Sequence, residues 1–307
     1  MMDRQREALR EKSKDCIMPY KSESATRKPS PPASHQLQCM EVWGGNTAIE
    51  SGISLPGIDA WVYSQPFKGQ ASGGDVHYVS MCGMGRIGRF MLADVSGHGT
   101  SVSELAIQLR KLMRKSIGRH DLTRLVRGLN RAFGRLSESG VFATAVIMTY
   151  FAPTDQLVCC LAGHPRPLWY QAATRTWSLL GPSLTDTLEF QGLPLGIIRS
   201  TEYRQFAVTL NRGDLIVAYT DSLIESHAPD REPQGEDGLL SVASSIGAGQ
   251  PATFGHDLIA AVDRASGDAA TTRDDDLTLL VLHHNASDPK PVSIGHRLRM
   301  MLKMMGL

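Results

Sequence analysis

The stretch at residues 89–99, RFMLADVSGHG, constrains the fold of this chain more than any other. Its first half is a short apolar run, which is typical of a fully buried β-strand. The run stops at Asp94, and a glycine-rich turn follows, where the backbone can approach a ligand closely. A carboxylate at such a corner is costly to bury unless it is paired or bound to a metal. We therefore expect Asp94 to have a partner of one of these two kinds.

Three further acidic sites stand at the ends of expected strands. Asp75 follows a glycine pair, Asp221 ends an apolar run, and residues 274–276 are three aspartates that lead straight into the segment LTLLVL. Carboxylate oxygens suit Mg²⁺ or Mn²⁺ better than zinc. If the strand order brings these sites together, they form a binuclear centre that can activate a water for attack on a phosphoryl group. Spacing alone leaves a structural role open for each aspartate, because Asp often serves as a turn residue or a cap.

The order of the expected elements favours an α+β fold. Hairpins and helix pairs come in blocks rather than in strict βαβ alternation, which indicates layers with antiparallel sheets. Strands are expected at residues 58–65, 76–81, 87–94, 142–151, 156–161, 168–170, 176–179, 203–210, 215–220 and 277–283. Helices are expected at residues 101–117, 121–133 and 252–265.

Composition excludes several classes of protein. The formal charge of +1 gives no electrostatic argument for binding nucleic acid. No apolar run reaches the roughly 18 residues of a transmembrane span, and the first residues lack the apolar middle region of a secretory signal. The five cysteines include no CxxC pair, which suits a reducing compartment. We therefore expect a cytoplasmic protein.

The chain divides into three expected segments. Residues 1–39 form an N-terminal extension that should be flexible, because its second half is a linker rich in Ser and Pro. Residues 40–285 contain all the expected strands. Residues 286–307 form a basic tail that can pack on its own domain, form a homodimer, or dock a partner or an anionic surface. Its apolar residues recur at helical spacing: Ile294, Leu298, Met301, Leu302 and Met305.

The chain resembles the SpoIIE-like branch of the PPM (type-2C-like) metal-dependent serine/threonine phosphatases of bacteria. The resemblance covers roughly residues 58–283 and implies a four-layer α-β-β-α sandwich with metals in a cleft at one edge of its two sheets. Each matching segment is weak evidence alone, but together they occur in the order of the family. The segments are GGD at 73–75, ADVSGHG at 93–99, FATAVIMTYFAPTDQLVCCLAGHPRPLWY at 142–170, GLPLGI at 192–197, GDLIVAYTDSLIES at 213–226 and DDLTLLVL at 275–282.

The resemblance also implies roles for single residues. Asp75 and Asp94 are similar to the catalytic pair that bridges or flanks two Mn²⁺ or Mg²⁺ ions. Val95 stands where the family has a backbone carbonyl ligand. Asp221 and Asp275 look like the remaining carboxylate ligands of one ion. A metal-activated water would then attack the phosphorus of a phosphoserine or phosphothreonine, without a covalent phosphoenzyme.

Two details of this assignment stay open. The aspartate run leaves the register uncertain by one residue, so Asp276 is the alternative to Asp275 as a ligand. The family usually has glycine after the third aspartate, whereas Ser222 stands here. Serine would be strained if that position needed a positive φ angle, and activity would then be lower.

Two histidines and a serine lie within these segments. His98 can donate a proton to the leaving oxygen as a catalytic residue, or it can be a loop histidine that bonds to the backbone. His164, in the AGHP turn, is expected to fix that turn. Ser96 suggests a serine nucleophile, but the pattern G-x-S-x-G is absent, so we reject a serine hydrolase.

Three functions remain. The first is a serine/threonine phosphatase that acts on a phosphorylated regulatory protein, which in this family is often an anti-sigma-factor antagonist. The second is a weakly active or inactive relative that binds a phosphoprotein as a regulatory module. The third is a phosphohydrolase that acts on small phosphate esters. Turnover of a phosphoprotein against free phosphorylated metabolites separates the first from the third, and binding with Mn²⁺ but without turnover would favour the second.

Overall fold

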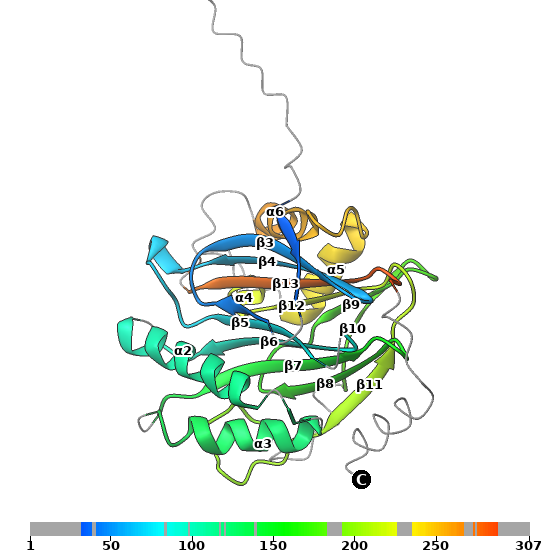
Figure 1. Cartoon of the computed structure of the whole chain (residues 1–307). Helices are drawn as coiled ribbons and strands as arrows, with labels where there is room; N and C mark the ends of the chain where they lie inside the picture. The colour runs from blue at the N-terminus through cyan, green and yellow to red at the C-terminus, as the bar shows by residue number, and fades with distance from the viewer. Residues whose placement is uncertain are drawn as a thin grey trace, which may run out of the picture. The chain divides into compact units, whose positions relative to one another are not determined.

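The protein was analysed as a computed structural model, which describes residues 32–38, 41–82, 85–97, 99–116, 118–119, 121–137, 140–182, 192–225, 235–266, 273 and 275–287. All of these residues belong to one unit, Pro31–Leu307. Within them the strands form two stacked sheets, and helices cover the outer face of each sheet (Figure 1). This arrangement confirms the α+β fold and the sandwich of two mainly antiparallel sheets that the sequence predicts.

Sheet A has seven strands in the order β1-β3-β4-β13-β12-β9-β10. Only β1 and β3 run parallel, and every other neighbouring pair in this sheet is antiparallel. The strands are β1 (Ser34–Gln36), β3 (Ile49–Leu55), β4 (Ile58–Gln65), β9 (Leu168–Gln171), β10 (Thr176–Leu179), β12 (Leu215–Tyr219) and β13 (Leu277–His284).

Sheet B has six strands in the order β11-β8-β7-β6-β5-β2, and all its neighbouring pairs are antiparallel. The strands are β2 (Val42–Gly45), β5 (Val76–Cys82), β6 (Ile87–Val95), β7 (Ala143–Phe151), β8 (Gln156–Ala162) and β11 (Gln205–Thr209). Strand β6 contains the apolar run that precedes Asp94, and all but one of its residues are buried.

Each sheet has its own pair of helices. Helices α2 (Thr100–Lys115) and α3 (Leu122–Phe133) cover sheet B, whereas α5 (Gly235–Ile246) and α6 (Phe254–Ser266) cover sheet A (Figure 1). Separate apolar cores fill the space between the sheets and the space under each helix pair. Two short helices complete the described elements: η2 (Phe67–Gly69) and α4 (Ser222–Glu225).

Helix α3 shows how the sequence dictates this packing. Asp121 is its N-cap and accepts a hydrogen bond from the backbone N–H of Arg124 at 2.9 Å. The apolar side chains recur at helical spacing and face sheet B: Leu122, Leu125, Val126, Leu129 and Phe133.

The sequence misses several elements. Strands β2 and β3 and helix α5 were not predicted, and β1 lies within the segment 1–39 that is expected to be a flexible extension. The predicted tail at 286–307 lies outside the described residues except for its first two positions, and the helix predicted within it from Ser293 lies wholly outside them. The boundaries of the three segments therefore stay predictions. Among the described helices, none is long and apolar enough to cross a membrane.

Candidate metal centre

The strand register places the predicted acidic sites at one edge of the sandwich. In sheet B, Val76 pairs with Ala93, so Asp75 and Asp94 are neighbours across β5 and β6. In sheet A, the end of β12 lies beside the start of β13, where Thr220 N donates to Thr278 O at 3.0 Å. Asp221 and Asp275 therefore occupy the same end of that sheet.

The carboxylate of Asp276 joins the two sheets at this edge. Its Oδ1 accepts a hydrogen bond from Phe67 N at 2.6 Å, and its Oδ2 accepts from Gly74 N at 2.5 Å and from Asp75 N at 3.3 Å. A Cβ atom on Gly73 would lie 2.2 Å from Oδ2, so only glycine permits this approach. The glycine pair of the GGD segment thus lets the loop before β5 close over a carboxylate from β13.

Asp75 is almost completely buried and is tied to sheet A. Its Oδ2 accepts a hydrogen bond from Thr220 Oγ1 at 2.9 Å. Burial, followed by the nearby charges of Asp94 and Asp276, raises the pKa of Asp75 well above its usual value. The side chain is thus held in place by its neighbours, but the charged form is disfavoured there.

Asp94 is half-buried at the end of β6, among other acidic groups. Burial raises the pKa of its carboxyl to about 8, with further contributions from other carboxylates: Asp221, Asp275, Asp276 and Glu225. Burial and Glu225 also raise the pKa of Asp221. Among the described groups that shift the pKa values of Asp75, Asp94 and Asp221, none is a basic side chain. We call this cluster the acidic edge; it consists of Asp75, Asp94, Asp221, Glu225, Asp275 and Asp276.

The backbone of Val95 lies against the GGD loop. Val95 N donates to Gly74 O at 3.3 Å, and a Cβ on Gly74 would lie 2.8 Å from Val95 O. The predicted carbonyl ligand is therefore next to the loop that carries Asp75. The two acidic segments of sheet B, which lie some twenty residues apart in the sequence, meet at this point.

The donor set suits a hard divalent cation, because it consists of carboxylate and carbonyl oxygens at a place with excess negative charge. Within the described residues, however, no three Asp, Glu, His or Cys side chains are arranged closely enough to hold a metal ion. The acidic edge thus brings the predicted ligands to one end of the sandwich.

The family model described as Stage II sporulation protein E (SpoIIE) matches residues 86–285, which is more than half of the chain. The chain belongs to the SpoIIE family. The match includes Asp94, Asp221 and Asp275, whereas Asp75 precedes it.

A curated relative and several solved structures agree with this family. The chain is 29% identical over 199 residues to Phosphoserine phosphatase RsbU of Bacillus subtilis (strain 168), which covers 62% of this chain and 55% of the relative. The chain therefore spans about half the length of the curated relative that it matches. The RsbU and RsbW domains of Rv1364c from Mycobacterium tuberculosis match with a TM-score of 0.64 and 24% identity, over 84% of this chain and 70% of that chain.

Two further solved structures share the fold. The PP2C phosphatase domain of SpoIIE from Bacillus subtilis, with a fragment of its regulatory domain, matches with a TM-score of 0.58 and 16% identity, over 80% of this chain and 64% of that chain. RsbX in complex with magnesium matches with a TM-score of 0.53 and 18% identity, over 76% of this chain and 99% of that chain. These likenesses show the PP2C-type fold.

The serine that replaces a glycine of the SpoIIE family is not strained. Ser222 is the first residue of α4, and it is absent from the described non-glycine residues with positive φ. Helix α4 is held by the carbonyl of Asp221, which accepts from Ile224 N at 2.8 Å and from Glu225 N at 2.9 Å. The expected penalty of serine at this position therefore does not arise.

Glu225 is a member of the acidic edge that was not predicted from the sequence. It belongs to α4 and raises the pKa values of both Asp94 and Asp221. The available signal was its position four residues after Asp221, since residues at that spacing share one face of a helix. Because α4 has only four residues, no apolar periodicity predicted a helix there.

The predictions for the two histidines in the SpoIIE family segments fare differently. His98 lies outside the described residues, so its catalytic role stays a prediction. His164 is buried, and its Nδ1 lies 3.0 Å from Thr144 Oγ1, on the strand position that pairs with Asp94. Burial lowers the pKa of His164 to about 3, so the ring is neutral at physiological pH. His164 therefore connects the AGHP turn to the strand beside Asp94.

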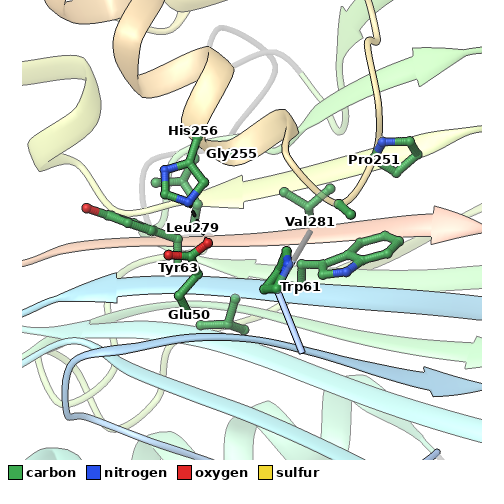
Figure 2. Close-up of a pocket in the computed structure, with 11 residues that line it drawn as sticks. Glu50, Trp61, Tyr63, Pro251, Gly255, His256, Leu279 and Val281 are labelled. Carbon is green, nitrogen blue, oxygen red and sulfur yellow. Dashed lines mark hydrogen bonds and ion pairs between the residues drawn. The ribbon is translucent and has the colours of Figure 1, made fainter. Parts of the chain in front are cut away.

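A small pocket lies elsewhere, between the outer face of sheet A and the start of α6 (Figure 2). Trp61 and Tyr63 from β4 form part of its wall, and His256 Nε2 lies 2.7 Å from Glu50 Oε1 beside it. Its volume of about 20 Å³ is close to that of one water probe. None of the predicted ligands lines this pocket, so it is separate from the acidic edge.

Proposed function

We propose that this chain is a metal-dependent serine/threonine protein phosphatase that hydrolyses phosphoserine or phosphothreonine by direct attack of a metal-activated water. The observation that carries this proposal is the acidic edge. Its carboxylates raise one another's pKa values, and no basic side chain among the described groups offsets them. Such a cluster is costly to maintain for structure alone, and strongly shifted pKa values are typical of functional sites.

The proposed ligands are those that the sequence predicts. Asp75 and Asp94 lie at the centre, the carbonyl of Val95 adds one oxygen, and Asp221 and Asp275 complete the set. We favour Asp275 over Asp276 as the ligand, because three backbone N–H groups already occupy the Asp276 carboxylate. When bound, two Mn²⁺ or Mg²⁺ ions would lower the pKa of a water and offset the charge of the phosphoryl group.

The residues around the ligands would position them. Thr220 fixes the Asp75 carboxylate through its hydroxyl, and Asp276 fixes the loop that carries Asp75. In this proposal His98 donates a proton to the leaving serine or threonine oxygen, which would otherwise depart as an alkoxide. In this proposal the reaction proceeds without a covalent phosphoenzyme.

The proposed substrate is a phosphorylated regulatory protein, such as an anti-sigma-factor antagonist. The likeness to a relative named as a phosphoserine phosphatase supports a phosphoserine substrate. The solved chain in which an RsbU domain and an RsbW domain occur together supports a place in a regulatory system. The alternative substrate is a small phosphate ester. A comparison of turnover on a phosphoprotein and on free phosphorylated metabolites would reveal it.

A weakly active or inactive phosphoprotein-binding module is the second candidate. It is favoured by one observation, that the described side chains do not already form a metal-holding group. The unusual Ser222 no longer supports it, because this residue is helical and unstrained.

The test is turnover of p-nitrophenyl phosphate and of a phosphoserine peptide, after EDTA treatment and after addition of excess Mn²⁺ or Mg²⁺. We expect no turnover in EDTA and restored turnover with Mn²⁺. Free phosphoserine is the control that separates a protein phosphatase from a metabolite phosphohydrolase. Full activity in a rigorously metal-free sample would contradict the proposal, whereas Mn²⁺ binding without turnover of any substrate would favour the second candidate.

A further inference from the structure

The two helix layers of the sandwich carry opposite charge. Residues 100–135, which include α2 and α3, contain nine Lys or Arg and only two Asp or Glu. Residues 235–266, which include α5 and α6, contain four Asp or Glu and one Arg. Since the whole chain has a formal charge of only +1, the basic character of the α2–α3 layer is a local feature.

Exposed apolar side chains gather at the end of α3. Of the four large hydrophobic residues that are exposed in the described chain, three lie here: Leu136 at 47%, Ile197 at 49% and Ile198 at 36%. Three arginines that are close to these residues in the sequence are also exposed: Arg131, Arg135 and Arg199. We call these six residues the arginine patch. Scattered exposed apolar residues are ordinary, whereas a cluster mixed with arginine is typical of a protein-binding surface.

The arginine patch is held together by Asn130, a buried residue of α3. Asn130 Oδ1 accepts from Gly196 N at 2.8 Å, and its Nδ2 donates to Ile198 O at 2.9 Å. The loop that carries Ile197, Ile198 and Arg199 is therefore fastened to the helix that carries Arg131. A fastened surface loses less conformational entropy on binding than a loose one does.

The arginines of the patch differ from their neighbours on the same helix. Arg124 pairs with Asp121 at 3.1 Å, and Arg127 pairs with Glu202. No carboxylate of the described chain forms an ion pair with Arg131, Arg135 or Arg199. Their charge is therefore available to a partner.

Strand β7 connects the loop of the arginine patch to the strand that leads to the acidic edge. Ala143 and Leu195 exchange two backbone hydrogen bonds, of 2.9 and 2.7 Å, and Ala143 is the register partner of Val95 on β6. Leu195 is two residues from Ile197. The patch thus begins two residues after a position that lies one strand away from the predicted carbonyl ligand.

We propose that the arginine patch docks an acidic surface of a protein substrate, while the phosphorylated side chain of that substrate reaches the acidic edge. This inference rests on the proposed phosphatase function and names the chemistry of its substrate. Arginine favours this occupant, because its planar group binds carboxylates with two hydrogen bonds and is enriched at protein interfaces, where lysine is depleted. Leu136, Ile197 and Ile198 would pack on apolar residues of the same surface.

The test uses two synthetic phosphoserine peptides of equal length, one with Asp, Glu and Leu around the phosphoserine and one with Lys and Leu. Turnover with Mn²⁺ and binding by fluorescence anisotropy in EDTA are measured for both peptides at low and high salt. We expect the acidic peptide to have a kcat/KM and an affinity that are about tenfold higher at low salt, and this preference should shrink at high salt, because exposed charges are screened.

The double variant Arg131→Glu/Arg135→Glu should lose this preference, mainly through KM, while its turnover of p-nitrophenyl phosphate reports that it is folded and loaded with metal. Arg264→Glu is the matched control, because Arg264 is exposed on α6 in the other helix layer. It should keep the preference of the wild type.

Equal turnover and equal binding of the two peptides would overturn the docking proposal, as would a preference that survives in the double variant. Patch-dependent binding to phosphatidylserine vesicles without a peptide preference would also overturn it in favour of a membrane. If the wild type hydrolyses neither peptide nor the small ester but still binds the acidic peptide through the patch, docking stands and the phosphatase function fails.

Discussion

The two ends of strand β13 carry acidic groups in opposite electrostatic settings. At its C-terminal end, His284 Nε2 lies 2.9 Å from Asp155 Oδ1, and His283 Nδ1 lies 3.7 Å from Asp59 Oδ2. We call this the paired end. At its N-terminal end, Asp275 and Asp276 lie in the acidic edge, where the neighbouring charges are other carboxylates. One strand thus connects an end where aspartates lie beside histidines to an end where the neighbouring charged groups are other carboxylates.

The pKa values show the consequence of this difference. Burial raises the pKa of Asp59, but the nearby imidazole of His283 and hydrogen bonds from Ser54 and Asn285 outweigh it and hold the pKa below its usual value. At the acidic edge, burial and neighbouring carboxylates act in the same direction and raise the pKa of Asp94 to about 8. An aspartate at a strand end is thus better judged by its partners than by its position in the sequence.

The largest expected difference between the two ends is in turnover. Asp94→Asn keeps the size of the side chain but removes a charge that the cations need, so we expect kcat on p-nitrophenyl phosphate with Mn²⁺ to fall by roughly a thousandfold, since several kcal/mol of transition-state stabilisation would be lost. The matched change at the paired end is Asp155→Asn. Asn tolerates the positive φ of position 155, so this variant should stay within a few-fold of the wild type.

Circular dichroism of both variants would show that they are folded. Near-wild-type turnover by a folded Asp94→Asn would mean that Asp94 is only a turn residue, and the contrast between the two ends would then have no catalytic meaning.

A smaller effect is expected in the pH dependence of thermal stability in EDTA. The folded state holds the Asp94 proton more tightly than the unfolded state does. The stability that this protonation gives to the fold is therefore fully present below pH about 4 and is lost as the pH rises through about 8. Asp94→Asn should therefore unfold at a higher temperature than the wild type at pH 8.5, by at least about 2 °C, and the difference should shrink toward pH 5.

Asp59→Asn should behave in the opposite way. Because the pKa of Asp59 is lowered in the folded state, its carboxylate stabilises the fold at pH values above its usual pKa, and this stability is lost on acidification. The variant should therefore be less stable than the wild type at pH 7, and the difference in melting temperature should close toward pH 3. Melting curves that shift in the same direction for both variants would contradict the electrostatic distinction between the ends.

The smallest effect is expected from removing the tail that follows the paired end. Residues 289–307 contain no Asp or Glu, so they can supply no carboxylate side chain as a ligand. Truncation should follow Asp288, which also keeps Ser287, whose Oγ accepts a hydrogen bond from Gly57 N at 3.0 Å. Turnover of p-nitrophenyl phosphate should then stay within a few-fold, whereas a folded, metal-binding truncation without turnover would place the tail in the active site.

Most of the fold could be predicted from the sequence because the core strands are strongly patterned. Strand β4 has the predicted bounds, 58–65, and the predicted second helix, capped by Asp121, is α3. Strands β2 and β3 were missed because they are short or rich in Gly and Ser and lie near the edges of their sheets, where burial imposes a weaker pattern.

The candidate site was less predictable than the fold. The sequence could indicate that Asp75, Asp94 and Asp221 end or precede strands, but their convergence depends on which strands are neighbours. The contacts of Asp276 with the loop before β5 join positions about 200 residues apart, and no local pattern reports such a contact. Glu225 was missed for a similar reason, because a single helical turn leaves no periodic signal.

A calorimetric titration of Mn²⁺ into protein stripped with EDTA tests the central claim, that the acidic edge holds divalent cations, without requiring a substrate. We expect the wild type and Asp155→Asn to bind Mn²⁺ with equal affinity, and Asp94→Asn to bind it at least about tenfold more weakly, since each 1.4 kcal/mol of lost binding is worth a factor of ten. Wild type that takes up no Mn²⁺, or Asp94→Asn that binds it as tightly as the wild type does, would contradict the account.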